Sequence, residues 1–291
     1  MANNVLEVKG LSSWFATENG DVKVIDDVSF SIAEGEIFGL VGESGSGKSV
    51  TSRSIIRLLP EDGSTAYEGS ILVEGTDVLR ISESRMRAMR GNEIAMVFQD
   101  PMSALNPVYT IGDQIMESIL THRRVGKAQA RKLTIETLDA VGYPSPEQAL
   151  SKYPHQLSGG MRQRVVIAIA VACRPKLLIA DEPTTALDVT TQKQIVDLIL
   201  DLSQRFGMAV LFISHDLNLV ADISNRVAVM YHGRIVEQGT VESIFDHPQR
   251  AYTKGLISCI PPLHRAVPEE LATVPANLDE FGDLGPAKEG R

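Results

Sequence analysis

The chain has 291 residues, of which 43% are hydrophobic and 22% charged, and its formal net charge is -9. This composition is typical of a globular protein that can bury a sizeable core. The net negative charge argues against a primary role in binding nucleic acid, which favours a basic surface. The two cysteines, Cys173 and Cys259, form neither a metal-ligand spacing nor a disulfide framework, which favours a reducing, cytosolic compartment.

Nothing in the sequence predicts a membrane crossing. The N-terminal residues lack the basic and apolar regions of a signal peptide, and the longest apolar stretch, 165–173, is too short to span a bilayer. If the protein works at a membrane, another chain must do the spanning.

The N-terminal third predicts a sheet. Residues 5–8 and 22–32 alternate as strands do, and a turn-prone stretch at 18–21 joins them. Short strands are also expected at 69–73 and 94–98. These segments predict antiparallel β strands at the N-terminus.

A glycine-rich loop follows an apolar run at 36–41 and precedes a helix predicted over 48–59. Its sequence is Gly42-Glu43-Ser44-Gly45-Ser46-Gly47-Lys48-Ser49. Backbone N–H groups of such a turn, and the positive end of the following helix, can close around phosphates. Lys48 is then placed to reach the terminal phosphates and the Ser49 hydroxyl to bind Mg²⁺. A plain strand-to-helix turn is the alternative. All eight residues fit the phosphate-binding pattern G-x-x-x-x-G-K-S, and a predicted strand precedes and a predicted helix follows them, which favours binding of a nucleoside triphosphate.

The pattern changes to helical spacing at about residue 101. Helices are expected at 110–122, 127–141 and 159–173, after which strands and helices alternate over 177–180, 189–206, 209–213, 217–224 and 227–231. Alternation of this kind predicts a largely parallel sheet with helices on its faces. We therefore expect an α/β core at 1–100 and 166–249, an inserted helical subdomain at 101–165, and a C-terminal extension at 250–291. The acidic end of this extension, 266–291, predicts a mobile tail.

Two carboxylates end the apolar strand predicted at 177–180. Asp181 is a candidate to hold Mg²⁺, and Glu182 is a candidate to orient and deprotonate an attacking water. An isolated Asp-Glu pair would more simply be a solvated turn. A phosphate-binding loop in the same chain favours the catalytic interpretation.

Other polar residues lie where ligands bind in such folds. Ser158-Gly159-Gly160 precedes a helix and predicts a second anion-binding N-terminus, although alone it would more often be a simple cap. Gln99 and His215 each follow a predicted strand, at the end where open parallel sheets bind ligands. Singly each would be structural, but together with the loop they favour catalysis.

These motifs resemble the ATP-binding cassette family over about residues 5–260. The matches are Walker A at 42–49, the Q-loop at Gln99, the signature at 157–163, Walker B at 177–182, the D-loop at Thr185-Ala186-Leu187-Asp188, and the switch histidine His215. The resemblance implies an ATPase with a P-loop NTPase (RecA-like) core. ATP and Mg²⁺ are then the expected cofactors.

The resemblance also assigns roles to individual residues. Glu182, His215 and Gln99 are expected to be catalytic, and Ser49, Gln99 and Asp181 to hold the metal. Cassettes of this family act as head-to-tail dimers, so Ser158 and Gly160 are expected to contact the γ-phosphate held by the opposite subunit. The remaining nucleotide-binding residues that the resemblance implies are Phe15, Val50, Gly159 and Asp188. Phe15 would stack on adenine, with core packing as its alternative role.

Longer strings resemble the oligopeptide, dipeptide and nickel importer branch. They lie at 98–107, 153–161, 181–190 and 247–256. Many members of this branch continue with a cysteine-rich stretch, whereas here only Cys259 lies in that region, so no iron–sulfur centre is expected. The resemblance implies an ATP-hydrolysing importer subunit that couples cassette dimerisation and hydrolysis to uptake, of peptides first, or of nickel or another small solute.

Partners and location follow from the same resemblance. We expect a second, related cassette in a heterodimer, two membrane permease subunits and, indirectly, an extracytoplasmic solute-binding protein, at the cytoplasmic face of the inner membrane. One alternative, a soluble cassette ATPase acting on DNA or ribosomes, is disfavoured by the acidic balance and by the lack of a second cassette. The other, a non-transport P-loop switch or kinase, is disfavoured by the signature and His215.

Overall fold

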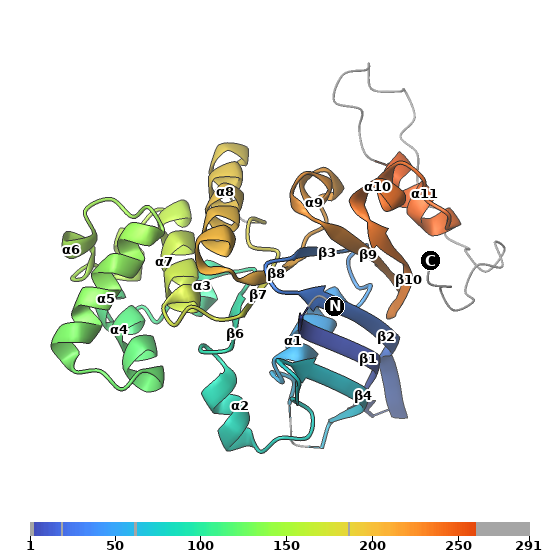
Figure 1. Cartoon of the computed structure of the whole chain (residues 1–291), viewed down its shortest axis with the longest axis horizontal. Coiled ribbons are helices and arrows are strands. Elements are labelled where there is room, and N and C mark those ends of the chain that lie inside the picture. The colour runs from blue at the N-terminus through green and yellow to red at the C-terminus, as the bar shows by residue number, and fades with distance from the viewer. Residues whose placement is uncertain (1–2, 19, 61–62, 186, 260–291) are drawn as a thin grey trace. The chain divides into compact units, whose positions relative to one another are not determined.

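A computed structural model of the chain describes residues 3–18, 20–60, 63–185 and 187–259. These residues form two compact units (Figure 1). Unit 1 consists of the described residues within 1–6, Ile32–Glu36 and Leu72–Leu211, and unit 2 of those within Glu7–Ser31, Ile37–Ile71 and 212–291. The tail predicted at 266–291 lies outside the described residues.

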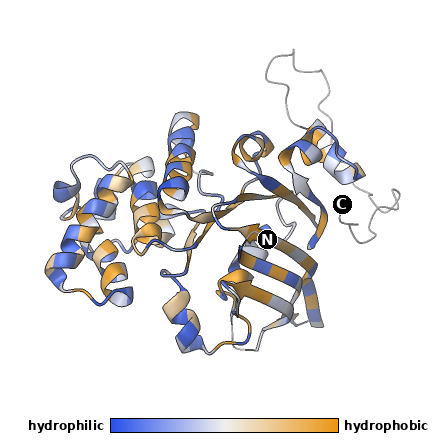
Figure 2. Cartoon of the chain, in the orientation of Figure 1, coloured by the Kyte–Doolittle hydropathy of each residue, from blue (hydrophilic) through white to orange (hydrophobic). Residues whose placement is uncertain are grey.

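The N-terminal strands lie mostly in unit 2, in the order β2-β1-β4. They are β1 (Asn4–Thr17), β2 (Gly20–Ala33) and β4 (Thr65–Val73). The short connection between β1 and β2 allows only an antiparallel pair, as predicted. Apolar and polar residues alternate along these strands, visible as orange and blue bands in Figure 2. In β2 the alternation shifts by one residue between the buried Ile25 and Val28, where Asp27 has a φ of +54° instead of an extended conformation.

Unit 2 also contains a second group of strands, in the order β10-β9-β3. They are β3 (Ile37–Val41), β9 (Arg226–Tyr231) and β10 (Arg234–Thr240). β3 runs parallel to β9, and β9 antiparallel to β10, with an irregularity between Ile235 and Glu237. The helices of unit 2 are α1 (Lys48–Ile55), α9 (Leu217–Ile223), α10 (Val241–Phe245) and α11 (Ala251–Ser258).

The sequence predicted a helix to residue 59, but α1 ends at Ile55. Arg57 has a φ of +49°, which is incompatible with a continuing right-handed helix. The prediction of the helix end was therefore wrong. Strand β10 and helices α10 and α11 were not predicted from the sequence.

The strands of unit 1 are almost wholly buried. β6 (Ile94–Val97) pairs in parallel with β7 (Leu177–Asp181), and β8 (Ala209–Ile213) lies on the other side of β7. Burial on both faces explains why these strands are continuous apolar runs without alternation. The small strand β5 (Thr76–Asp77) pairs antiparallel with the end of β4.

Helix α7 (Gly159–Val171) is the centre of the helical part of unit 1. It contacts α3 (Pro101–Ala104), α4 (Ile111–His122), α5 (Lys127–Ala140), α8 (Val189–Phe206) and β6. Its residues from Val165 to Val171 are buried almost without exception, as expected for a helix surrounded by protein. α7 continues across residue 165, where the sequence analysis placed the end of the helical insertion; the domain boundaries remain predictions.

The remaining elements of unit 1 are short. They are α2 (Glu83–Met89), α6 (Pro146–Ala149) and the 3₁₀ turn η1 (Pro154–Gln156). Ser82 begins α2 by accepting a hydrogen bond from the Arg85 N–H, and Met86 and Met89 anchor it in the core.

Gly69 is required where β4 crosses β1. It has a φ of +88°, and a Cβ at this position would lie 2.4 Å from the Gly10 carbonyl oxygen. Gly75, in the turn after β4, has a φ of +76° but nothing within 4 Å of such a Cβ. Gly69→Ala should therefore reduce the free energy of unfolding by about 1–3 kcal/mol more than Gly75→Ala, because only Gly69 adds a backbone clash to the strain of φ. Urea unfolding of the two variants measures this difference, and equal losses would contradict it.

Candidate functional site

The glycine-rich loop lies in unit 2, between the buried strand β3 and the first turn of α1. Gly42, Gly45 and Gly47 have φ values of +150°, +81° and +108°. A Cβ on Gly42 would lie 2.1 Å from the carbonyl oxygen of Met230 in β9. The loop therefore packs directly on the backbone of β9, and only glycine fits there.

Lys48 is buried at the base of this loop. Its side chain is 5% exposed, and its Nζ donates to the carbonyl oxygens of Gly42 at 2.8 Å and Glu43 at 2.9 Å. Glu43, Ser44 and Gly45 are exposed, so the mouth of the loop faces solvent. A buried ammonium group lined by backbone dipoles, at a helix N-terminus, suits a polyanionic ligand.

The other predicted residues of unit 2 lie on separate elements. Phe15 lies on β1 and is half-buried, next to Trp14, whose ring has the Lys23 Nζ 4.8 Å from its centroid. His215 follows β8 and is exposed, immediately before Asp216, which caps α9 by accepting from the Leu219 N–H.

Glu182 and Gln99 meet in unit 1. β6 and β7 are parallel neighbours, so their carboxyl ends lie side by side, and Gln99 Nε2 donates to Glu182 Oε2 at 2.9 Å. Thr185 Oγ1 donates to the same oxygen at 2.9 Å. Asp181, at the end of β7, is 4% exposed. The structure thus brings together two of the three predicted catalytic residues, next to the predicted metal-binding carboxylate.

Glu182 has an unusual backbone conformation. Its φ is +47°, in the left-handed region that a glutamate rarely adopts, and Pro183 follows it. The proline disfavours the right-handed helical conformation at the residue before it. Strain of this kind persists where the surrounding structure fixes the backbone, and it concentrates at functional sites.

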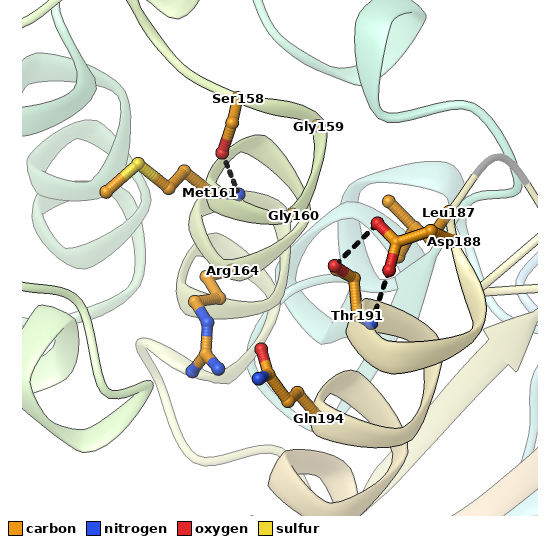
Figure 3. A pocket seen from close by; sticks show the side chains of 9 residues that line it. All are labelled: Ser158, Gly159, Gly160, Met161, Arg164, Leu187, Asp188, Thr191 and Gln194. Atoms are coloured by element: carbon orange, nitrogen blue, oxygen red, sulfur yellow. Dashed lines mark hydrogen bonds between the residues drawn. The ribbon is translucent and has the colours of Figure 1, made fainter.

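The N-termini of α7 and α8 line a pocket of about 390 Å³ in unit 1 (Figure 3). Ser158 Oγ caps α7 by accepting from the Met161 N–H, and Asp188 caps α8 by accepting from both the N–H and the hydroxyl of Thr191. These hydrogen bonds from Thr191 lower the pKa of Asp188. A Cβ on Gly160 would lie 2.6 Å from Thr191 Cγ2, so the two helix ends approach closely only because residue 160 is glycine.

Three residues that shape these sites were given no role of their own from the sequence, although Thr185 lies in the D-loop match. Thr185 holds Glu182, and Thr191 holds Asp188 and packs on Gly160. Tyr252 accepts a hydrogen bond from the Glu43 N–H of the loop. Thr185 and Tyr252 lie inside strings that resemble the importer branch, which is the signal that would have pointed to them.

None of the described helices combines the length and the hydrophobicity needed to cross a membrane.

Comparisons with known proteins identify the family of the chain. A family model described as ABC transporter matches residues 25–185. An oligopeptide transport ATP-binding protein of Bacillus subtilis (strain 168) is 50% identical over 271 residues, which cover 93% of this chain and 76% of the relative. A dipeptide transport ATP-binding protein of the same organism is 50% identical over 259 residues, which cover 89% of this chain and 77% of the relative.

The fold of the chain is also similar to that of solved ATP-binding cassettes. A dimeric ATP-binding cassette in a post-hydrolysis state, bound to ADP and phosphate, superposes with a TM-score of 0.71 at 26% identity, covering 81% of this chain and 98% of that one. These similarities confirm the predicted P-loop NTPase fold and nucleotide binding. The chain belongs to the ABC transporter family and is one of its ATP-hydrolysing cassettes.

Proposed function

We propose that this chain is the ATPase subunit of an importer that takes up peptides. The peptide assignment rests on sequence identity. Over most of its length the chain is 50% identical to proteins named for oligopeptide and dipeptide transport. Nickel or another small solute is the second candidate, because that branch shares the motifs. The names of these relatives, all of transport proteins, disfavour a soluble cassette acting on DNA or ribosomes.

ATP binding is proposed to begin at the glycine-rich loop. The triphosphate would accept hydrogen bonds from Lys48 Nζ, which in this structure donates to the carbonyl oxygens of Gly42 and Glu43. Charge-assisted hydrogen bonds of this kind are among the strong ones. The exposed mouth of the loop admits the phosphates. Phe15, half-buried on β1, would stack on the adenine, and Val50 lies in the first turn of α1.

The residues proposed to hold Mg²⁺ are Ser49, Gln99 and Asp181. Mg²⁺ prefers oxygen ligands, and these residues supply a hydroxyl, an amide oxygen and a buried carboxylate. Gln99 uses its amide nitrogen toward Glu182, so its oxygen is the atom suited to a metal. When bound, the ion would neutralise charge on the outer phosphates.

Glu182 is the proposed general base. Phosphoryl transfer chiefly requires an oriented water and stabilised charge. The hydrogen bonds from Gln99 and Thr185 to one carboxylate oxygen fix the orientation of the group, as a base that must meet a water at one position requires. His215 is proposed to contact the γ-phosphate and that water.

The active assembly is proposed to be a dimer of cassettes. Ser158, Gly159, Gly160 and Asp188 line the pocket at the ends of α7 and α8, which would receive the γ-phosphate held by a second, related cassette. Two membrane permeases would bind the cassettes at the cytoplasmic face of the inner membrane, and a solute-binding protein outside it would deliver the peptide.

The solute is tested in the reconstituted complex. Peptide-loaded solute-binding protein should raise ATP hydrolysis in vesicles, whereas the nickel-loaded form should not. The reverse result would remove the peptide assignment.

The heterodimer is tested by mass analysis of the complex purified from native membranes. Two different cassettes should be found, and two copies of this chain without a second cassette would rule the heterodimer out.

Lys48→Ala should reduce ATP turnover by about 10²–10³-fold or abolish it, the loss expected when one charge-stabilising donor is removed. Lys132→Ala removes an exposed lysine on α5 as the matched control. ATPase assays on the assembled complex measure both. Undiminished turnover in Lys48→Ala would remove the assignment of the loop.

Glu182→Gln keeps the shape of the side chain but removes the base. Turnover should fall by about 10²–10⁴-fold. ATP should still bind and close the dimer, so ATP should increase the dimer fraction in size-exclusion chromatography with light scattering. Hydrolysis at the wild-type rate would show that the base lies elsewhere.

A further inference from the structure

Helix α11 is fixed at its start to strand β10. Glu237 follows the irregularity in β10 and is 9% exposed. Its carboxylate accepts from the backbone N–H groups of Gln249, at 2.7 Å, and Arg250, at 3.2 Å. Arg250 is the residue that begins α11. A buried carboxylate needs such donors, so the position of α11 is determined by β10.

Tyr252 then reaches from α11 to the glycine-rich loop. Its side chain is 4% exposed, and its ring packs on Tyr231 of β9 with the centroids 4.3 Å apart. Its hydroxyl accepts a hydrogen bond from the Glu43 N–H at 3.3 Å. Burial raises the pKa of Tyr252 to about 12, so the hydroxyl stays protonated at neutral pH.

The Glu43 backbone connects Tyr252 to Lys48. The N–H of Glu43 donates to Tyr252, and its carbonyl oxygen accepts from Lys48 Nζ. On the other side of the loop, the Ser46 carbonyl oxygen accepts from the Gly233 N–H of the β9–β10 turn. The loop is therefore held at two points, one of which belongs to the C-terminal helix.

We propose that Tyr252 is a positioning residue for ATP binding. Its hydroxyl holds the start of the loop, and thereby the carbonyl oxygens around Lys48, in the arrangement that receives the triphosphate. Glu237 acts through Tyr252, because it fixes the helix that carries the tyrosine. The C-terminal helix would thus support the nucleotide site from outside the Walker A, Walker B and signature motifs.

The test is Tyr252→Phe in the full chain, which keeps the ring and removes only the hydroxyl. One hydrogen bond contributes about 0.5–1.5 kcal/mol, so the Kd for ATP should rise about 2- to 10-fold. In the assembled complex the KM for ATP should rise by a similar factor with kcat changed less than twofold. An unchanged Kd, or a loss confined to kcat, would overturn the proposal.

Tyr143→Phe is the matched control. Tyr143 is 3% exposed, and its hydroxyl has no hydrogen-bond partner in the part of the chain that the structure describes. This variant should leave the Kd for ATP unchanged. If it raised the Kd by the same factor, the effect would be a general consequence of removing a buried hydroxyl, and the assignment of Tyr252 would fail.

Glu237→Gln tests the connection between the anchor and the tyrosine. Alone it should raise the Kd for ATP, because a neutral amide holds the start of α11 less strongly. In the Tyr252→Phe background it should have no further effect. Full additivity of the two changes would show that Glu237 does not act through Tyr252.

Discussion

The burial of the Lys48 ammonium group is the constraint on which unit 2 depends. A charge that is 5% exposed is costly unless polar groups surround it, and the carbonyl oxygens of Gly42 and Glu43 supply part of that surrounding. They converge on the lysine only because the loop turns through positive φ at its glycines and lies against β9 without a side chain between them. The strands β3 and β9 therefore serve to hold a loop that would be unfavourable in isolation.

In unit 1 the corresponding constraint is the fixed orientation of the Glu182 carboxylate. Gln99 and Thr185 both donate hydrogen bonds to the same oxygen, Glu182 Oε2. The two hydrogen bonds fix the orientation of the carboxylate, as the role proposed for Glu182 requires. The parallel pairing of β6 and β7 places Gln99 beside Glu182 even though they are 83 residues apart in the chain.

Helices, strands and loops that are defined by their own residues were predicted from the sequence. Those that depend on contacts with residues far away in the chain were not. The loop at 42–49, strand β7 and helix α8 each have a local pattern that is sufficient to define them. The end of α1 depends on the backbone of Arg57, and α11 depends on the buried Glu237, so neither has a local signal. Glu182 and Gln99 were chosen individually, because each lies just after a strand, but predicting the hydrogen bond between them would have required the strand order. The catalytic and metal-binding roles of all these residues remain predictions.

The contact between Glu43 and Tyr252 has a consequence for biosynthesis. The two residues are 209 positions apart. At about 5–20 residues per second, the ribosome makes the loop roughly 10–40 s before the residue that completes its support. Throughout that interval the nascent chain carries a glycine-rich loop without its C-terminal contact. The support that we propose for Tyr252 is therefore added late in the assembly of the nucleotide site, because the loop, β3 and α1 are all made before α11.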